Sequence, residues 1–203
     1  SAATFGRSLT QAEEIEVTTR RILFLLTLAV AVAGCEVADN TGNRAVTKER
    51  PTVNLPLSVR QKNWLGDRGE GSCVWASTIS LLRWQGRYRT AEWVRSNYGD
   101  GEWPDDHVAK LERAGIRYAY VTNGDVRFLE WCLRTRRGAG VTVMGGAHCV
   151  NLVFLDDRWA CLLDNNDVPR YRWVPRKTFL AEWRASYGWG FTVVYSPTPP
   201  LPP

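Results

Sequence analysis

Apolar residues recur at helical spacing in five stretches of the chain. Between 73 and 85 the apolar positions predict one buried helix face, and Gly86 follows as a typical helix stop; these positions are Val74, Trp75, Ile79, Leu82 and Trp84. A turn at 69–72 leads into this helix. The same periodicity predicts further helices at 90–98, 104–114, 125–137 and 177–185.

Shorter apolar runs between turn signals predict strands at 117–121, 141–144, 149–155, 159–163 and 191–195. The pair Asp156-Asp157 predicts a hairpin with a two-residue turn, which pairs Leu155 with Arg158 and Leu152 with Cys161. Because most helices precede most strands, we expect an α+β fold with helices packed on an antiparallel sheet.

The N-terminal part of the chain has the pattern of an export signal. Two arginines precede the apolar run 22–34, which is shorter than the about 20 residues that a membrane-spanning helix needs. Val32-Ala33-Gly34-Cys35 resembles a bacterial lipobox, in which Cys35 carries the lipid. We interpret 17–35 as this signal or, alternatively, as an uncleaved anchor helix. Either one predicts a membrane-anchored body on the extracytoplasmic side, periplasmic or at the cell surface.

The remaining segments complete the expected organisation. Residues 1–16 fit no part of a signal and are interpreted as an upstream extension, since Val17 stands where a GTG start codon can be read. The polar segment 36–60 predicts a tether, and 61–195 is the expected folded domain. The proline-rich end, 196–203, predicts an extended tail.

Composition narrows the classes of function. With 44% apolar and 23% charged residues, a chain of 203 residues can bury a core, which excludes a largely disordered protein. The net charge of +5 is scattered along the chain, so we expect no nucleic-acid partner. Five cysteines are too few for a disulfide-built scaffold, and without CxxC or HxxxH spacing we expect no metal or other cofactor.

A candidate nucleophile opens the first predicted helix. Cys73 falls in the first turn, where unpaired backbone N–H groups and the positive end of the helix dipole favour a thiolate over a thiol. A thiolate is the form that attacks a carbonyl carbon. The alternative is a small buried hydrophobe without chemistry.

The candidate base is one of two histidines. His148 follows a glycine turn and opens a predicted strand, whereas His107 falls at the start of a helix and is expected at the surface. The hairpin register places His148 opposite Asn165, and a bulge would bring Asp164 there instead. Either side chain can accept a hydrogen bond from the imidazole and orient it, leaving the other ring nitrogen for the thiol.

Gly71-Ser72-Cys73 on a helix, with His148 on a strand and Asp164 sixteen residues later, resembles the papain-like cysteine peptidases. Their signature is C-G-[SA]-C-[WY]; here Glu70 replaces the first cysteine and Val74 the aromatic residue. The interval of 75 residues from cysteine to histidine is about half that of papain, so the domain is more similar to the compact bacterial C39-like members. The resemblance implies a nucleophile helix packed on an antiparallel sheet.

The resemblance also implies a glutamine about six residues before the nucleophile, which donates to the oxyanion. Asp67 occupies that position here, and its charge would repel an oxyanion. If 65–70 is an inserted loop, Gln61 takes this role, twelve residues before Cys73.

These observations predict an exported, lipid-anchored cysteine peptidase that acts on peptide or protein substrates through Cys73, His148 and either Asp164 or Asn165. Two alternatives remain open: a non-catalytic papain-fold lipoprotein that binds a protein partner through its tryptophans or its proline-rich tail, and a CHAP-type cell-wall amidase. Four tryptophans fall at helical positions suited to the core, namely Trp84, Trp93, Trp131 and Trp183.

Overall fold

A computed structural model describes residue 53 and residues 55–65, 71–99 and 101–195. The predicted export signal with Cys35, the extension 1–16, Asp67 and the proline-rich tail lie outside these ranges. Within them, no helix combines the length and the apolar character needed to cross a membrane.

The helices form where apolar residues recur every three to four positions, within three residues of the predicted bounds. They are α2 (Cys73–Trp84), α3 (Tyr88–Asn97), α4 (Pro104–Arg113), α5 (Val126–Arg134) and α6 (Arg176–Ala185). Local signals fix the ends of several. Pro104 occupies the first turn of α4, and the Asp125 side chain caps α5 by accepting from the Arg127 backbone N–H.

The strands of the described residues form one antiparallel sheet in the order β1-β6-β2-β3-β4-β5. They are β1 (Tyr118–Val121), β2 (Ala139–Val143), β3 (His148–Leu155), β4 (Trp159–Leu163), β5 (Tyr171–Pro175) and β6 (Gly190–Val193). The sequence did not predict β5. It is an edge strand that ends in proline, as edge strands tolerate, and its half-buried and exposed positions do not alternate strictly.

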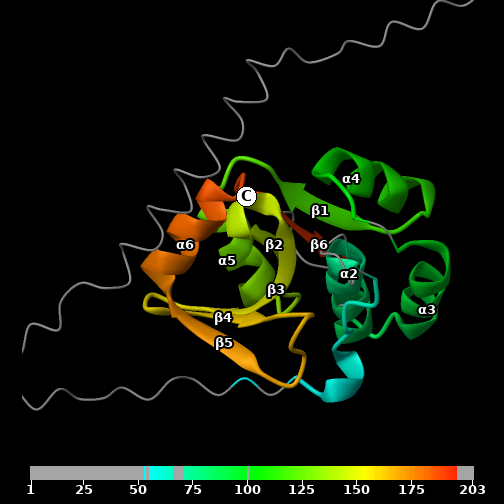
Figure 1. The fold of residues 1–203 in the computed structure, drawn as a ribbon, viewed down its shortest axis with the longest axis horizontal. Coiled ribbons are helices and arrows are strands. Elements are labelled where there is room, and N and C mark those ends of the chain that lie inside the picture. The colour runs from blue at the N-terminus through cyan, green and yellow to red at the C-terminus, as the bar shows by residue number, and fades with distance from the viewer. Residues whose placement is uncertain (1–52, 54, 66–70, 100, 196–203) are drawn as a thin grey trace, which may run out of the picture. The chain divides into compact units, whose positions relative to one another are not determined.

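Helices cover both faces of the sheet (Figure 1), which agrees with the expected α+β class. On one face, residues of α2, α3 and α4 share a core with Cys149 of β3 and with Phe191 and Val193 of β6. On the other face, α5 and α6 pack on alternate residues of β2, β3 and β4. The start of α2 and the start of β3 thus belong to one layered body.

The register of the β3–β4 hairpin differs from the prediction. Leu155 pairs with Ala160 rather than Arg158, and Leu152 pairs with Leu162 rather than Cys161. The turn lies one residue later than predicted, because the Asp156 backbone N–H donates to the Trp159 carbonyl and leaves Asp157 and Arg158 between them. The Asp156 side chain stabilises this turn by accepting from the backbone N–H groups of Arg158 and Trp159. A bulge between Leu152 and Phe154 shifts the register again before the strands reach the end at His148.

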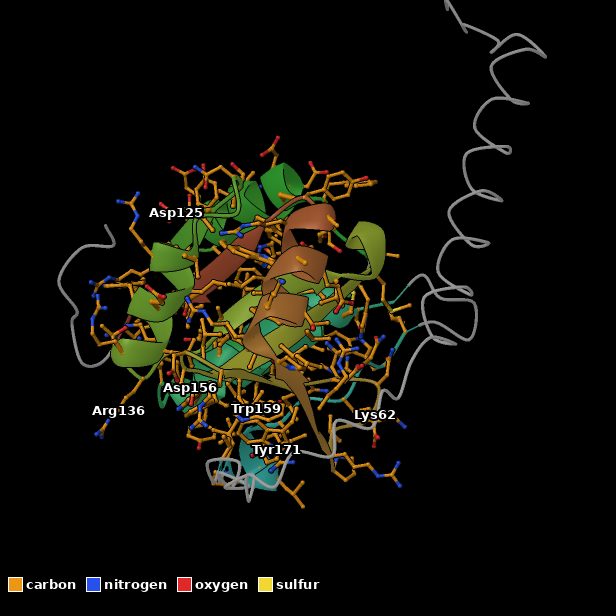
Figure 2. All side chains as sticks on the ribbon, turned by 90° about the vertical axis from the view of Figure 1, so that its left-hand side faces the viewer. Lys62, Asp125, Arg136, Asp156, Trp159 and Tyr171 are labelled. Carbon is orange, nitrogen blue, oxygen red and sulfur yellow. The ribbon has the colours of Figure 1, made fainter. Side chains whose placement is uncertain are left out.

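The folded body begins before residue 61, inside the predicted tether. Leu55 precedes a short 3-10 turn, η1 (Leu57–Val59), and Val59 ends it. Both side chains are buried in a small core on β3 and β4. Arg60 donates to the hydroxyl of Tyr171, which is labelled in Figure 2. The sequence did not indicate this because Leu55 and Val59, four residues apart, lie in a segment of mostly polar composition.

His107 is fully buried, so the prediction of a surface position was wrong. Its Nε2 lies 2.9 Å from the Thr78 hydroxyl of α2, and its ring contacts three aromatic rings, those of Trp75, Trp189 and Phe191. Although α4 begins with two aspartates, His107 lies four residues before the buried Leu111 and therefore shares its face. Burial, aided by the charge of Lys110, lowers the pKa of His107 to about 3.

The tryptophan predictions were correct in part. Trp131 and Trp183 are buried and Trp84 is half-buried, but Trp93 is 46% exposed. On α3 the buried face is carried by the small residues Ala91 and Val94, and the Trp93 side chain lies beside it.

Candidate active site

Cys73 is the first residue of α2, as predicted. The segment before the helix anchors its start: the Ser72 hydroxyl donates to Asn63 Oδ1 over 2.6 Å and accepts from the Trp64 N–H over 3.0 Å. Gly71 allows this approach, since a Cβ there would lie 2.5 Å from Asn63 Nδ2. The segment before α2 therefore fixes the start of the helix that carries the thiol.

His148 is the first residue of β3, where it pairs with Val143 of β2. The turn between the strands, η2 (Met144–Gly146), needs glycine. Gly145 and Gly146 have φ of 65° and 91°, and a Cβ on Gly146 would lie 2.4 Å from the Tyr187 ring. This turn sets where the imidazole leaves the sheet.

Asp164 is the residue that contacts the imidazole. His148 Nε2 lies 2.9 Å from Asp164 Oδ1, and the same oxygen accepts from the Asn166 N–H over 2.9 Å. The side chains of His148 and Cys73 are hydrogen-bonded to each other. Because Nε2 is taken by Asp164, Nδ1 is the nitrogen that remains for the thiol.

The electrostatics of this group favour charge separation. Burial raises the pKa of Cys73, but the hydrogen bond and charge of His148 and the backbone N–H groups of Cys149 and Val74 outweigh it, so that the pKa lies below its usual value. Burial lowers the pKa of His148, yet Asp164 and Cys73 together raise it to about 9. The hydrogen bond from His148 also lowers the pKa of Asp164. An imidazolium at His148 thus stabilises both the thiolate of Cys73 and the carboxylate of Asp164.

Asn165 does not contact the imidazole in any hydrogen bond of the described residues. Its amide nitrogen lies within hydrogen-bonding distance of the Cys73 carbonyl (3.1 Å), the Ser77 hydroxyl (3.2 Å) and the Cys149 carbonyl (2.7 Å). The sequence left Asp164 and Asn165 open as partners of His148. Past the bulge Asn151 pairs with Leu163, so strand alternation puts Asp164 on the same face of the hairpin as His148 and Asn165 on the other face.

Gln61 is not brought to the thiol. Its backbone N–H donates to the hydroxyl of Ser80, seven residues beyond Cys73 and so about 10 Å further along the helix axis. Its side-chain amide donates to the Lys62 carbonyl. The amide that reaches the start of α2 belongs instead to Asn63, which no spacing rule singled out.

Ser77 and Asn151 form further contacts between α2 and β3, outside the candidate triad, that the sequence did not indicate. The Ser77 hydroxyl donates to the Cys149 carbonyl, and Asn151 Nδ2 donates to the Ser77 carbonyl over 3.1 Å. The sequence indicates only that each is a polar residue among apolar neighbours and so needs a buried partner. Which partner it finds depends on the tertiary structure.

Comparison with known proteins does not assign a family to the chain. No protein-family model matches the chain, and no curated protein matches it significantly. Among the described residues, no group of three or more histidine, cysteine and acidic side chains is placed to hold a metal ion.

Proposed function

We propose that the chain is a papain-like cysteine peptidase, that is, a hydrolase of peptide or related amide bonds. The observation that carries this proposal is the continuous contact from the Cys73 thiol through the His148 ring to the Asp164 carboxylate. Three residues from α2, β3 and the end of β4 meet in an order that suits nucleophilic catalysis, with nucleophile, base and orienting group in line.

The chemistry follows from the charges. The Cys73 thiolate attacks the carbonyl carbon of the substrate, and a C–S bond forms as the carbonyl oxygen becomes an oxyanion. His148 then gives its proton to the amine nitrogen, the C–N bond breaks and a thioester remains. His148, now neutral, takes a proton from water; the hydroxide attacks the thioester and releases the acid, which restores the thiolate and the imidazolium.

The oxyanion lies near the positive end of α2. The first helical hydrogen bond of this region runs from the Ala76 N–H to the Ser72 carbonyl, so the helix ladder does not use the N–H of Cys73. This N–H can donate a hydrogen bond to the oxyanion, and the positive end of the helix dipole stabilises its charge.

A thiol-directed epoxide probe tests the proposal. We expect labelling of Cys73 at neutral pH, resolved from the other cysteines by peptide mass spectrometry, and loss of most of it in His148→Ala. Exposed Asp167→Ala, three residues beyond Asp164, serves as the matched control and should label like wild type. Equal labelling of wild type and His148→Ala would overturn the proposal.

A binding role is the second candidate, favoured by two exposed tryptophan side chains. Trp103 is 69% exposed and Trp93 46% exposed, both in the helical part. If the epoxide does not label Cys73 but Trp103→Ala abolishes capture of a protein partner, the chain is a binding module.

Export and lipid attachment at Cys35 form a separate part of the proposal. A lipid-sized mass on an N-terminal peptide that begins at Cys35 would support it.

A further inference from the structure

A buried amide lies directly behind the proposed nucleophile. Asn165 follows Asp164 at the end of β4 and is only 2% exposed. Its nitrogen contacts the Cys73 carbonyl and the Ser77 hydroxyl, both on α2, and the Cys149 carbonyl on β3. One side chain therefore joins the helix that bears the thiol to the strand that bears the imidazole.

The orientation of this amide is determined by its neighbours. Two of the three are carbonyl oxygens, which can only accept hydrogen bonds, so the NH2 group must face them. It does so although Asn165 Oδ1 is buried without a hydrogen-bond partner among the described residues. A carboxylate of the same shape would set negative oxygen against both carbonyls. The position thus requires a donor.

The contacts close a ring around the thiol. The Cys149 N–H bonds to the Cys73 sulfur, while the Cys149 carbonyl accepts from Asn165, which also holds the Cys73 carbonyl. Any shift of the first turn of α2 relative to the start of β3 would stretch at least one of these bonds. The distance between sulfur and imidazole depends on the same two elements.

We propose that Asn165 is a positioning residue, which acts on the Cys73 thiol through the main chain and keeps it in hydrogen-bonding reach of His148. This inference rests on the proposed function, because it assigns a role within the same site. Two successive residues that follow β4 then have different roles. Asp164 orients the imidazole, and Asn165 holds the start of α2 close to the imidazole.

Asn151 provides a matched control. It is also 2% exposed and also joins β3 to α2, but it donates to the Ser77 carbonyl, one helical turn beyond Cys73. Removing either amide takes a donor away from a buried carbonyl and should therefore lower stability in both variants. Only the loss of Asn165 frees the turn that carries the thiol.

The test is the rate of alkylation of Cys73 by iodoacetamide in the full chain between pH 5 and 10, followed by peptide mass spectrometry. In Asn165→Ala we expect the pKa of the thiol to rise by about one unit, which lowers the rate at pH 6 about tenfold. Asn151→Ala should keep the wild-type profile while losing stability in urea. If Asn165→Ala does not fold, Asn165→Ser, which keeps one donor, should show an intermediate shift.

The outcomes separate this inference from the proposed function. A wild-type profile in folded Asn165→Ala or Asn165→Ser, together with a changed profile in His148→Ala, would overturn the positioning role alone. An unchanged profile in His148→Ala would overturn the proposed function itself. Equal shifts in Asn165→Ala and Asn151→Ala would also overturn the specific role of Asn165, because any loosening of α2 would then suffice.

Discussion

At the scale of single residues, the site balances burial against charge. Burial alone would keep Cys73 protonated and His148 neutral, yet the two side chains are hydrogen-bonded and each stabilises the ionised form of the other. Asp164 contributes a third charge on the far side of the ring. The state of the thiol is therefore a property of three residues and cannot be read from the helix start alone.

Removing the carboxylate should weaken this balance. In Asp164→Ala the pKa of His148 should fall from about 9 toward its usual value of 6.5, because the hydrogen bond and charge that raise it are lost. We expect kcat/KM on a peptide substrate to drop about 10–10²-fold, a part of what general acid–base catalysis contributes. The pH–rate profile checks this, since its alkaline limb should move to lower pH. An unmoved limb would contradict the role of Asp164.

Gln61 should be dispensable. Loss of an oxyanion donor lowers turnover about 10²–10³-fold, but the Gln61 amide donates to Lys62 and its backbone lies beside Ser80. The turnover of Gln61→Ala, measured by steady-state kinetics, should therefore stay within about threefold of wild type, far from the loss of an oxyanion donor. A hundredfold loss would mean that Gln61 reaches the thiol when substrate binds.

At the scale of elements, the helices and most strands could be predicted from local patterns, while the pairing between them could not. The bounds of α2 to α6 follow apolar periodicity, which is a property of neighbouring residues. The hairpin register depended on how Asp156 bonds the turn and on a bulge at Leu152–Phe154. That register decides between Asp164 and Asn165, so the candidate triad could be predicted only up to this choice.

The turn before His148 offers a test of how tightly this element is built. In Gly146→Ala a Cβ would lie 2.4 Å from the Tyr187 ring at a φ of 91°, and we expect about 2–4 kcal/mol of lost stability from strain and overpacking. Gly145→Ala is the matched control. Its φ is 65° with nothing within 4 Å, so it should cost only about 1–2 kcal/mol. Urea denaturation measures both, and equal losses would contradict the contact with Tyr187.

At the scale of the whole molecule, two cores lie on opposite faces of one sheet, and residues of β3, the strand that carries His148, belong to both. The core on the α2 face contains His107, which the sequence placed at the surface because its helix begins with charged residues. Helical phase, rather than the charge of immediate neighbours, decides burial here. A titratable ring in this core makes the stability of the fold dependent on pH.

The sign of this dependence follows from the pKa of His107. It is about 3 in the folded chain and 6.5 in the unfolded one, so the unfolded state binds more protons between these values. Stability is fully present above pH 6.5 and is lost as the pH falls toward 3, by up to about 1.4 kcal/mol per unit. His107→Phe should flatten the urea midpoints between pH 6.5 and 4. Parallel slopes in variant and wild type would refute this.

The rate at which iodoacetamide alkylates Cys73 from pH 4 to 10 tests the central claim most directly. For wild type, we predict a fast rate already near pH 6, because the thiolate is paired with the imidazolium, and a second inflection near pH 9, where His148 loses its proton. His148→Ala should show one ionisation, at or above the usual thiol value of 9.0. A single inflection near 9 in both proteins would mean that the sulfur and the imidazole do not act together.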